Sequence, residues 1–485
     1  MKTRPANERD TVGARLRRWL PLAPWLPLLA AGVALAAGLS DADVDLDWSR
    51  EQVQRHPGPI DFVLLSTGGI AGWHEPCGCT SNQSGGFGRR VGLDGLYAES
   101  LPDVPRLWLD AGDLVAPGAP HAAAVRKTRA QLEILGRLEA TALNLAAGEL
   151  GHGLAEYVAL AKEEALPLLS SSLKATDGEP VPWADHLVVE VGKRRLGLLG
   201  LMQLPAEDAP EALLGDRELS VLPLAIALKQ GKQRLSDAGV DLTVVLAAVP
   251  PDDMKALDDE LVGVDLILGT AGKSRLSEQV GDVRFAYAGD RGRLVIEMNV
   301  APRDADVPLL RSRYHELERR FPNDADAREL QRTVTREVND IHREEAQARA
   351  AASPRRKRSN HVAAESCRAC HVQEYLAWEG SKHAHAMETL VKAGSEFTPD
   401  CTSCHSTGFG QEGGFLSLSE TRQLADVQCE ACHGPGREHA ASGGRVEMGP
   451  VGEAGCVGCH DPDNSPEFDF ATYWPKIAHG SGSGR

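Results

Sequence analysis

The sequence predicts an α/β layered domain, followed by a helical connector and a mostly helical or irregular C-terminal segment. Over residues 59–300, apolar runs of strand length alternate with helical patterns, which is typical of layered α/β folds. Residues 301–360 are strongly charged and carry narrow apolar stripes at helical spacing. Residues 361–480 hold eight of the ten cysteines and nine of the sixteen histidines, in a segment poor in aliphatic residues.

Five runs in the first region have the length and composition of buried strands. They cover residues 60–65, 106–110, 242–247, 264–268 and 293–298. Residues 187–191 and 196–201 form a predicted hairpin with its turn at Gly192 and Lys193. Apolar residues at helical spacing predict a helix over 125–143.

The connector shows two patterns of helical period. Apolar residues recur at intervals of four, three and four over 310–321, and at four, four and three over 330–341. Both patterns predict charged amphipathic helices.

The first 45 residues have the features of an export signal. Three arginines precede an apolar stretch at 19–38, and Ala34-Leu35-Ala36 offers a cleavage site between small residues. The alternative is an uncleaved membrane anchor, although three prolines interrupt the first half of the stretch. Both interpretations place the body of the protein outside the cytoplasm, in the periplasm or its equivalent. The tail at 481–485 is expected to be disordered.

Four copies of Cys-x-x-Cys-His occur between residues 367 and 460. This pattern is the signature of c-type haem attachment, in which both thiols bond to haem and the histidine binds iron. The predicted attachment cysteines are Cys367, Cys370, Cys401, Cys404, Cys429, Cys432, Cys456 and Cys459. The predicted proximal ligands are His371, His405, His433 and His460. Zinc sites and disulfides also use cysteines, but four copies behind an export signal favour four covalently bound haem c groups.

Five further histidines lie in the same segment and could serve as second ligands. They are His361, His383, His385, His439 and His479. Bis-imidazole ligation lowers reduction potentials relative to His/Met ligation. An iron without a second ligand would be open to a small molecule, and five spare histidines neither require nor exclude one. The spacers between motifs, of 29, 23 and 22 residues, are too short and polar for an ordinary core, so the segment should not fold without haem.

The C-terminal segment resembles the tetrahaem cytochrome c family of ammonia-oxidising bacteria. The resemblance runs from Glu365 to Gly480 and depends on residues 367–386, 429–439 and 473–480. It implies that His383 or His385, His439 and His479 are distal ligands. His361 has no family motif around it.

The α/β region resembles the 5′-nucleotidase branch of the calcineurin-like metallophosphatases. The resemblance depends on residues 62–65, 85–90, 107–113, 148–153, 168–172 and 195–201. It implies a metallophosphatase-like sandwich, whose chemistry needs two metal ions. Of the family's ligand positions, the Gly-Asp pair is kept as Gly112-Asp113. The others fall here on Gly68 and Ile70, Glu149 and Leu150, near Ala248, and on Thr270 and Gly272, and one ligand cannot hold two metal ions. We therefore expect that the fold is kept and the hydrolase site is lost.

Near the expected site lies Trp73-His74-Glu75-Pro76-Cys77-Gly78-Cys79. Some exported nucleotidase-like proteins have a similar Glu-Pro-Cys-Gly-Cys element, in some cases with selenocysteine at the first cysteine. The resemblance implies a redox-active dithiol at Cys77 and Cys79, since a Cys-x-Cys disulfide would be strained and labile. The alternatives are a structural disulfide, or thiols that bind metal together with His74. Asp113, Glu149 and His152 are further candidates for the same pocket.

Composition narrows the possible partners. The formal net charge of −17 argues against nucleic acid or an anionic lipid surface as the main partner. Residues 361–485 contain 8 Lys and Arg against 17 Asp and Glu, which favours a basic redox partner. The first functional hypothesis is an exported multihaem electron carrier with a docking or thiol-redox domain. The alternatives are an oxidoreductase acting on a small nitrogen or sulfur species at the dithiol or an open haem, and a metal-dependent phosphoesterase.

Overall fold

The computed structural model describes residues 44–479 except 57, 77–82, 116–121, 207–208, 210, 271–274, 290, 353–358, 462–463 and 466. The predicted export signal, apart from its last two residues, lies outside the described part of the chain. So do Cys77, Cys79, Gly272 and the 481–485 tail. Among the helices that are described, none combines the length and apolar character needed to cross a bilayer.

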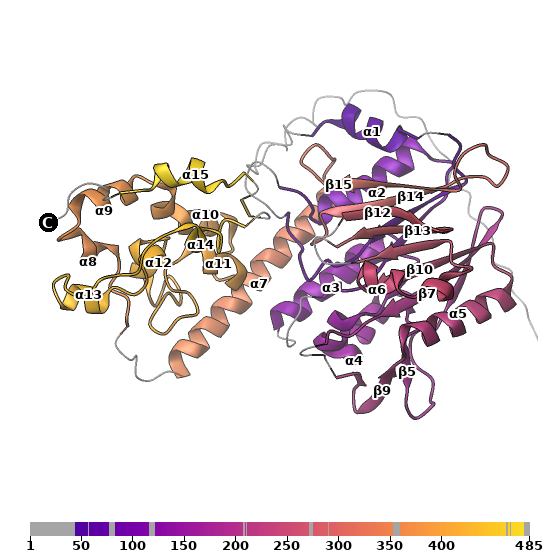
Figure 1. Cartoon of the computed structure of the whole chain (residues 1–485), viewed down its shortest axis with the longest axis horizontal. Coiled ribbons are helices and arrows are strands. Elements are labelled where there is room, and N and C mark those ends of the chain that lie inside the picture. Colours follow the sequence, from indigo (N-terminus) through magenta and orange to yellow (C-terminus); the bar gives the residue numbers. More distant parts are fainter. Residues whose placement is uncertain are drawn as a thin grey trace, which may run out of the picture. The chain divides into compact units, whose positions relative to one another are not determined.

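Two six-stranded sheets and one small sheet form the α/β part (Figure 1). The first sheet has the order β15-β14-β1-β2-β3-β4 and the second the order β12-β13-β11-β10-β7-β6. The strands of the first are β1 Phe62–Thr67, β2 Arg106–Asp110, β3 Ala142–Asn144, β4 Leu168–Leu169, β14 Leu294–Val300 and β15 Leu310–Glu316. Those of the second are β6 Leu187–Val191, β7 Arg194–Met202, β10 Leu242–Ala248, β11 Leu266–Gly269, β12 Arg275–Val280 and β13 Val283–Ala288. The small sheet contains β5 Leu173–Ala175, β8 Leu213–Leu214 and β9 Arg217–Val221.

The two large sheets pack face to face because their strands are apolar on both sides. In β1, Phe62 and Leu64 pack between the sheets, while Val63 and Leu65 pack under helices on the outer face. This alternation follows from the period of two along a strand. The result is a four-layer sandwich of helices, sheet, sheet and helices, which confirms the predicted fold class.

The helices of the α/β part cover the outer faces of the sheets (Figure 1). They are α1 Leu46–Gln54, α2 Phe87–Ser100, α3 Ala122–Arg137, α4 Ala147–Glu163, α5 Leu224–Ala238, α6 Pro251–Lys255 and the short 3₁₀ helix η2 Asp258–Leu261. The long helix α7 Ala325–Ala352 packs on α2 and α3. Its Val334 and Val338 are buried in the same apolar cluster as those helices.

Two sequence predictions of secondary structure are wrong. Residues 310–316 form strand β15 rather than a helix, and pair with β14 in antiparallel register. Residues at i and i+4 share a face in a strand as well as in a helix, so the spacing of Leu310 and Tyr314 does not distinguish the two. The open edge of β14, which needs a hydrogen-bonding partner, selects the strand. The predicted helix over 125–143 ends at Arg137, and its last residues join the sheet as β3. The α/β fold therefore continues past Val300 into the expected connector.

The C-terminal segment consists of short helices and irregular chain. Its elements are α8 Ala364–Arg368, α9 Val372–Glu379, η3 Lys382–His385, α10 Ala386–Ala393, α11 Pro399–His405, η4 Arg422–Leu424, α12 Cys429–His433, α13 Arg437–Ala441, α14 Glu453–Cys456, α15 Phe470–Tyr473 and η5 Trp474–Lys476. Its apolar cluster of buried residues has six members: Ala363, Met387, Leu390, Phe415, Leu424 and Ala425. Six residues are a small core for a segment that runs from residue 361 to residue 479.

Candidate haem-binding site

Each Cys-x-x-Cys-His motif lies on a helical turn. In the first motif the amide of His371 donates to the carbonyl of Cys367 at 3.0 Å, and in the fourth the amide of His460 donates to Cys456 at 2.9 Å. Residues four apart on a helical turn share a face, so the first cysteine and the histidine of a motif point to the same side. The eight described cysteines are free thiols, and Cys370 and Cys432 are exposed.

Three of the four motif histidines lie against a second imidazole. The ring centroids of His371 and His439 are 5.9 Å apart, those of His433 and His479 are 6.1 Å apart, and those of His460 and His383 are 6.1 Å apart. Two imidazoles that bind one metal ion from opposite sides have centroids about 6 Å apart, because each metal–nitrogen bond is about 2 Å. The described geometry therefore fits a bis-histidine iron at three motifs.

The electrostatics of these rings agree with ligation. Burial lowers the pKa values of His383, His433 and His460, and in His383 the neighbouring His460 adds to the effect. All three rings are therefore held in the neutral form that binds metal.

His405, in the second motif, differs from the other three. Its Nδ1 donates to the carbonyl of Ala386 at 2.7 Å, and within the described residues it has no second imidazole at the 6 Å spacing. The exposed His385 is directed to Glu388, with Nδ1 3.3 Å from Oε1. The buried His361 lies against Gly408, so neither of these histidines pairs with a motif histidine.

Contacts between thiols give the spatial order of the motifs. Cys367 of the first motif is in hydrogen-bonding contact with Cys429 of the third, and Cys404 of the second with Cys459 of the fourth. Burial raises the pKa of the Cys432 thiol, in the third motif, and the charge of Cys456, in the fourth, raises it further. These two thiols therefore lie close together. The motifs therefore follow one another in space as first, third, fourth, second.

Apolar side chains near the motifs are left exposed. Of the eleven large hydrophobic residues that are exposed in the described part of the chain, six fall in this quarter, namely Val372, Leu376, Val391, Leu416, Val446 and Val457. Single exposed apolar residues are ordinary on soluble proteins, but here they share one segment with the attachment motifs, where haem would cover apolar surface. A segment with exposed apolar residues, neutral paired imidazoles and surface thiols fits covalently attached haem.

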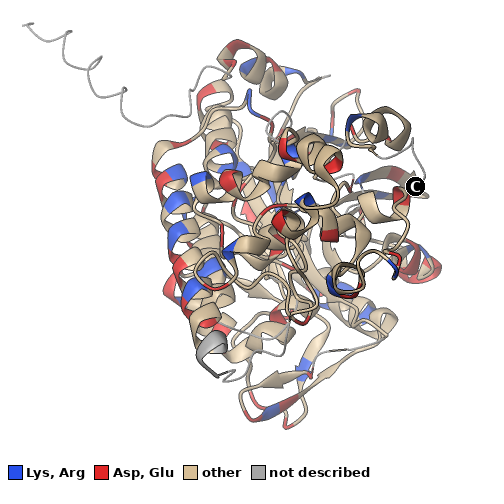
Figure 2. Ribbon diagram, turned by 90° about the vertical axis from the view of Figure 1, so that its left-hand side faces the viewer, with Lys and Arg blue, Asp and Glu red and all other residues tan. Residues whose placement is uncertain are grey.

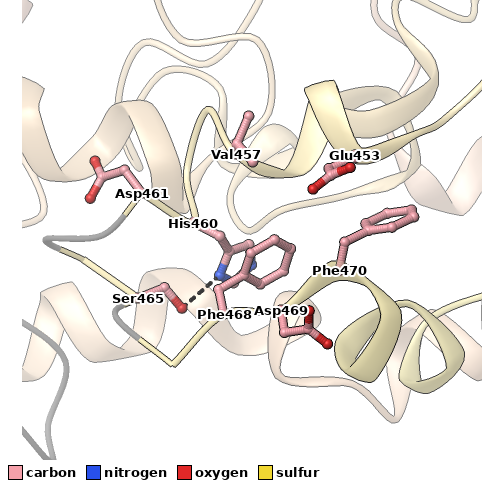
Figure 3. Close-up of a pocket in the computed structure, with 8 residues that line it drawn as sticks. All are labelled: Glu453, Val457, His460, Asp461, Ser465, Phe468, Asp469 and Phe470. Carbon is pink, nitrogen blue, oxygen red and sulfur yellow. Dashed lines mark hydrogen bonds between the residues drawn. The ribbon is translucent and has the colours of Figure 1, made fainter.

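A hollow of about 300 Å³ lies at the fourth motif, beside His460 (Figure 3). Val457, Phe468 and Phe470 supply its apolar lining, and Glu453, Asp461 and Asp469 lie at its edges. Phe468 stacks on the His460 ring with centroids 4.6 Å apart and ring planes 13° apart. The hydroxyl of Ser465 is 3.0 Å from His460 Nδ1.

In the α/β part, the positions expected to hold metal ions come together, but apart from Asp113 they carry side chains that are not the expected ligands. Gly68 lies against Ala111 and Thr270, and Gly112 lies against Ala146 and Ala248, all at the carboxyl ends of the parallel strands. In the described part of the chain, no group of three His, Cys, Asp or Glu residues could hold a metal ion. These residues do not fit a dinuclear metal site.

The acidic residues at this edge are bound to the backbone. Glu149 accepts from the amides of Leu114 at 2.8 Å and Ala146 at 2.9 Å, and Asp113 accepts from Gly148 at 3.1 Å. Burial raises the pKa of Glu149 to about 8, with a further contribution from Asp113. A carboxyl group that is largely protonated at neutral pH is a poor metal ligand. His152 is buried on α4.

The segment before Cys77 is attached to α7. The hydroxyl of Thr335 donates to Glu75 at 2.8 Å and lies 3.2 Å from His74 Nε2. Burial, with a contribution from Lys127, lowers the pKa of His74 to about 3. One turn further along α7, the side chain of Asn339 accepts from the amide of Phe397 at 2.9 Å.

This attachment reaches the second haem-binding motif. Burial raises the pKa of the Cys401 thiol to about 12, and the charge of Glu75 is its next cause. Glu75 therefore lies near the first cysteine of the motif that contains His405. Neither Thr335 nor Asn339 belongs to a sequence motif, and their roles follow only from the fold.

Comparison with known proteins covers the two parts separately. Residues 366–434 match the family model of cytochrome c554 and c-prime. Cytochrome c-554 of Nitrosomonas europaea is 37% identical over 100 residues, which are 17% of this chain and 43% of that protein. The chain thus spans less than half the length of this curated relative. The matches confirm the resemblance of the C-terminal segment and imply covalently bound c-type haem.

The α/β part is similar to solved structures of low sequence identity. The sulfate thiohydrolase SoxB of Thermus thermophilus aligns with a TM-score of 0.50 at 15% identity, over 57% of this chain and 61% of that one. A 5′-nucleotidase precursor of Thermus thermophilus aligns with a TM-score of 0.48 at 20% identity, over 57% and 59%. The first of these likenesses confirms the metallophosphatase-like fold.

Proposed function

We propose that this protein is an exported multihaem c-type cytochrome that carries electrons along four covalently bound haem groups. The observation that carries the proposal is the pairing of three motif histidines with second imidazoles at about 6 Å. Bound haem supplies reversible one-electron oxidation and reduction at its iron.

The residues that would hold the haem groups follow from the motifs and pairs. Attachment falls to the two cysteines of each motif: Cys367 and Cys370, Cys401 and Cys404, Cys429 and Cys432, and Cys456 and Cys459. The ligand pairs are His371 with His439, His433 with His479, and His460 with His383. His405 is the proximal ligand at the second motif.

The thiol contacts support a single path for electrons. Electron transfer slows steeply with distance, so neighbouring attachment sites exchange electrons fastest. The order first, third, fourth, second leaves the first and second motifs at the two ends of the path. The end at the second motif lies beside Glu75 of the α/β part.

His405 supports a second function at that end. Its ring is oriented by the Ala386 carbonyl and lacks a second imidazole among the described residues. With His405 as the single histidine ligand, a bound haem iron would have a position open to a small nitrogen or sulfur species. We infer that the chain either turns over such a molecule at the second motif or accepts its electrons there.

We propose that the α/β part serves as a docking or thiol-redox module. Glu75 lies two residues before Cys77 and near Cys401, which supports a dithiol at Cys77 and Cys79 that exchanges electrons with the second motif. A metal-dependent phosphoesterase is not favoured, because small side chains occupy the ligand positions.

The partner we propose is a basic redox protein outside the cytoplasm. Residues 361–485 carry 17 acidic against 8 basic residues, so long-range attraction favours a positive partner. On the ribbon, acidic and basic positions are interspersed (Figure 2). The apolar stretch at 19–38 supports export, with or without retention as an anchor.

Intact-protein mass spectrometry combined with a spectroscopic redox titration tests the proposal. We expect the mass of four haem groups, three low-spin irons and one high-spin iron that shifts on addition of a small ligand. The matched variant Cys77→Ser/Cys79→Ser should keep all four haem groups and lose electron exchange with thiol reductants. A mass that corresponds to fewer than four haem groups would contradict the proposed four-haem carrier. Electron exchange with thiol reductants that is the same in the double variant and the wild type would contradict the proposed redox dithiol.

A further inference from the structure

His460 differs from three other ligand histidines in what its outer ring nitrogen contacts. Its Nδ1 lies 3.0 Å from the hydroxyl of Ser465 (Figure 3). In His405, His439 and His479, Nδ1 instead donates to a main-chain carbonyl, at 2.7, 2.7 and 2.9 Å. With Nε2 directed to a metal ion, Nδ1 carries the proton, so Ser465 is the acceptor.

Hydrogen bonds to Asp461 hold Ser465 in this place. The amide of Ser465 donates to the carbonyl of Asp461 at 2.8 Å, and the Asp461 carboxylate accepts from the amide and side chain of Asn464 at 2.7 and 2.9 Å. Because Asp461 directly follows His460, these bonds keep Ser465 next to the ring. Phe468, stacked on the face of the His460 ring, restricts its rotation. The contact is therefore built by local structure.

The acceptor at Nδ1 controls the electron density of the ring. A strong acceptor draws the proton away and makes the imidazole a more basic ligand, which favours ferric iron and lowers the potential. A hydroxyl is a weaker acceptor than a peptide carbonyl. A ring bound to a hydroxyl is accordingly the less basic ligand.

We propose that Ser465 is a positioning residue that raises the reduction potential at the fourth motif relative to motifs whose histidines donate to carbonyls. The inference rests on the proposed electron-carrier function. In the spatial order, the fourth motif lies between the second and the third. A higher potential there favours residence of an electron at the fourth motif, between the two ends of the path.

Potentiometric titration of the full holoprotein tests this inference, with electron paramagnetic resonance to identify the affected iron. Ser465→Asp supplies a strong acceptor, so one of the four midpoints should fall by the equivalent of a tenfold change in its reduction equilibrium, about 59 mV for one electron. Ser465→Ala removes the acceptor and should shift the same midpoint upward. Ser465→Thr keeps the hydroxyl and should restore it.

Ser419→Asp is the matched control for added charge, because Ser419 is exposed and contacts Ser417 rather than a histidine. It should leave the order of the four midpoints unchanged. If Ser465→Asp and Ser465→Ala each bind four haem groups and each midpoint equals that of the wild type, the inference is overturned while the carrier function stays in place. If Ser465→Asp fails to bind haem, the test is the comparison of Ser465→Ala with Ser465→Thr. An upward shift of one midpoint in the first that is absent from the second supports the inference, and equal midpoints overturn it. Absence of haem from the wild-type protein would overturn the proposed function itself.

Discussion

The α/β part and the C-terminal segment bury apolar surface in different ways. In the first, three large clusters of buried side chains fill the space between and outside the sheets. In the second, six residues form the cluster, and apolar side chains near the motifs are exposed. The histidines of the two parts also differ in what they contact. His315 and His74 of the α/β part bind protein side chains, whereas three motif histidines each face a second imidazole from outside the motifs. We infer that the first part folds on its own apolar core and the second around haem.

Preventing haem attachment should have the largest effect. When the chain is produced without haem, residues 359–479 should lose protection from hydrogen exchange while the α/β part keeps it, because only the latter has its own core. Exchange monitored by mass spectrometry compares the two regions within one sample. Equal protection of both regions would refute the difference.

Removal of a core side chain should break the first part alone. Phe285 is fully buried on β13. Its replacement by alanine should lower the free energy of unfolding by roughly 3–5 kcal/mol, because apolar burial is lost and a cavity is left. Thermal unfolding followed by far-ultraviolet circular dichroism should show the loss. The haem absorption bands of the same sample are the control and should be unchanged before that transition.

Acidification should weaken the α/β part through Glu297. Burial by itself would raise its pKa, but the hydrogen bond and charge of His315 and the charge of Arg313 lower it to about 2. Because the folded pKa is depressed, its stabilising contribution is complete above about pH 4.5 and is lost as the pH falls toward 2. Denaturant unfolding between pH 6 and 2 measures this, and Glu297→Gln should remove that part of the pH dependence. An identical pH profile in the variant would exclude Glu297 as its source.

Substitution of one distal histidine should give the smallest structural effect and a clear spectroscopic one. His383→Ala should convert the iron at the fourth motif from low to high spin, because His383 faces His460 at 6.1 Å. His385→Ala is the control, since His385 is exposed and directed to Glu388. Electron paramagnetic resonance distinguishes the two. A spin change in His385→Ala alone would reverse the assignment.

Much of the fold could be predicted because local patterns were decisive. The strand over 106–110 and the hairpin at 187–201 have the periodicity and turn residues of the observed elements. β15 could not be predicted, because Leu310 and Tyr314 share a face in either a helix or a strand and only the free edge of β14 selects between them.

The sequence alone determined the haem attachment motifs and the replacement of metal ligands at Gly68, Ile70 and Ala248, because these depend on residue type and local spacing. Only the tertiary structure decided which histidines pair, that His385 and His361 stay outside the pairs, and that Ser465 contacts His460. His383 and His460 are far apart in the chain, and their meeting depends on how the short helices between them pack. No spacing rule in the sequence contains that information.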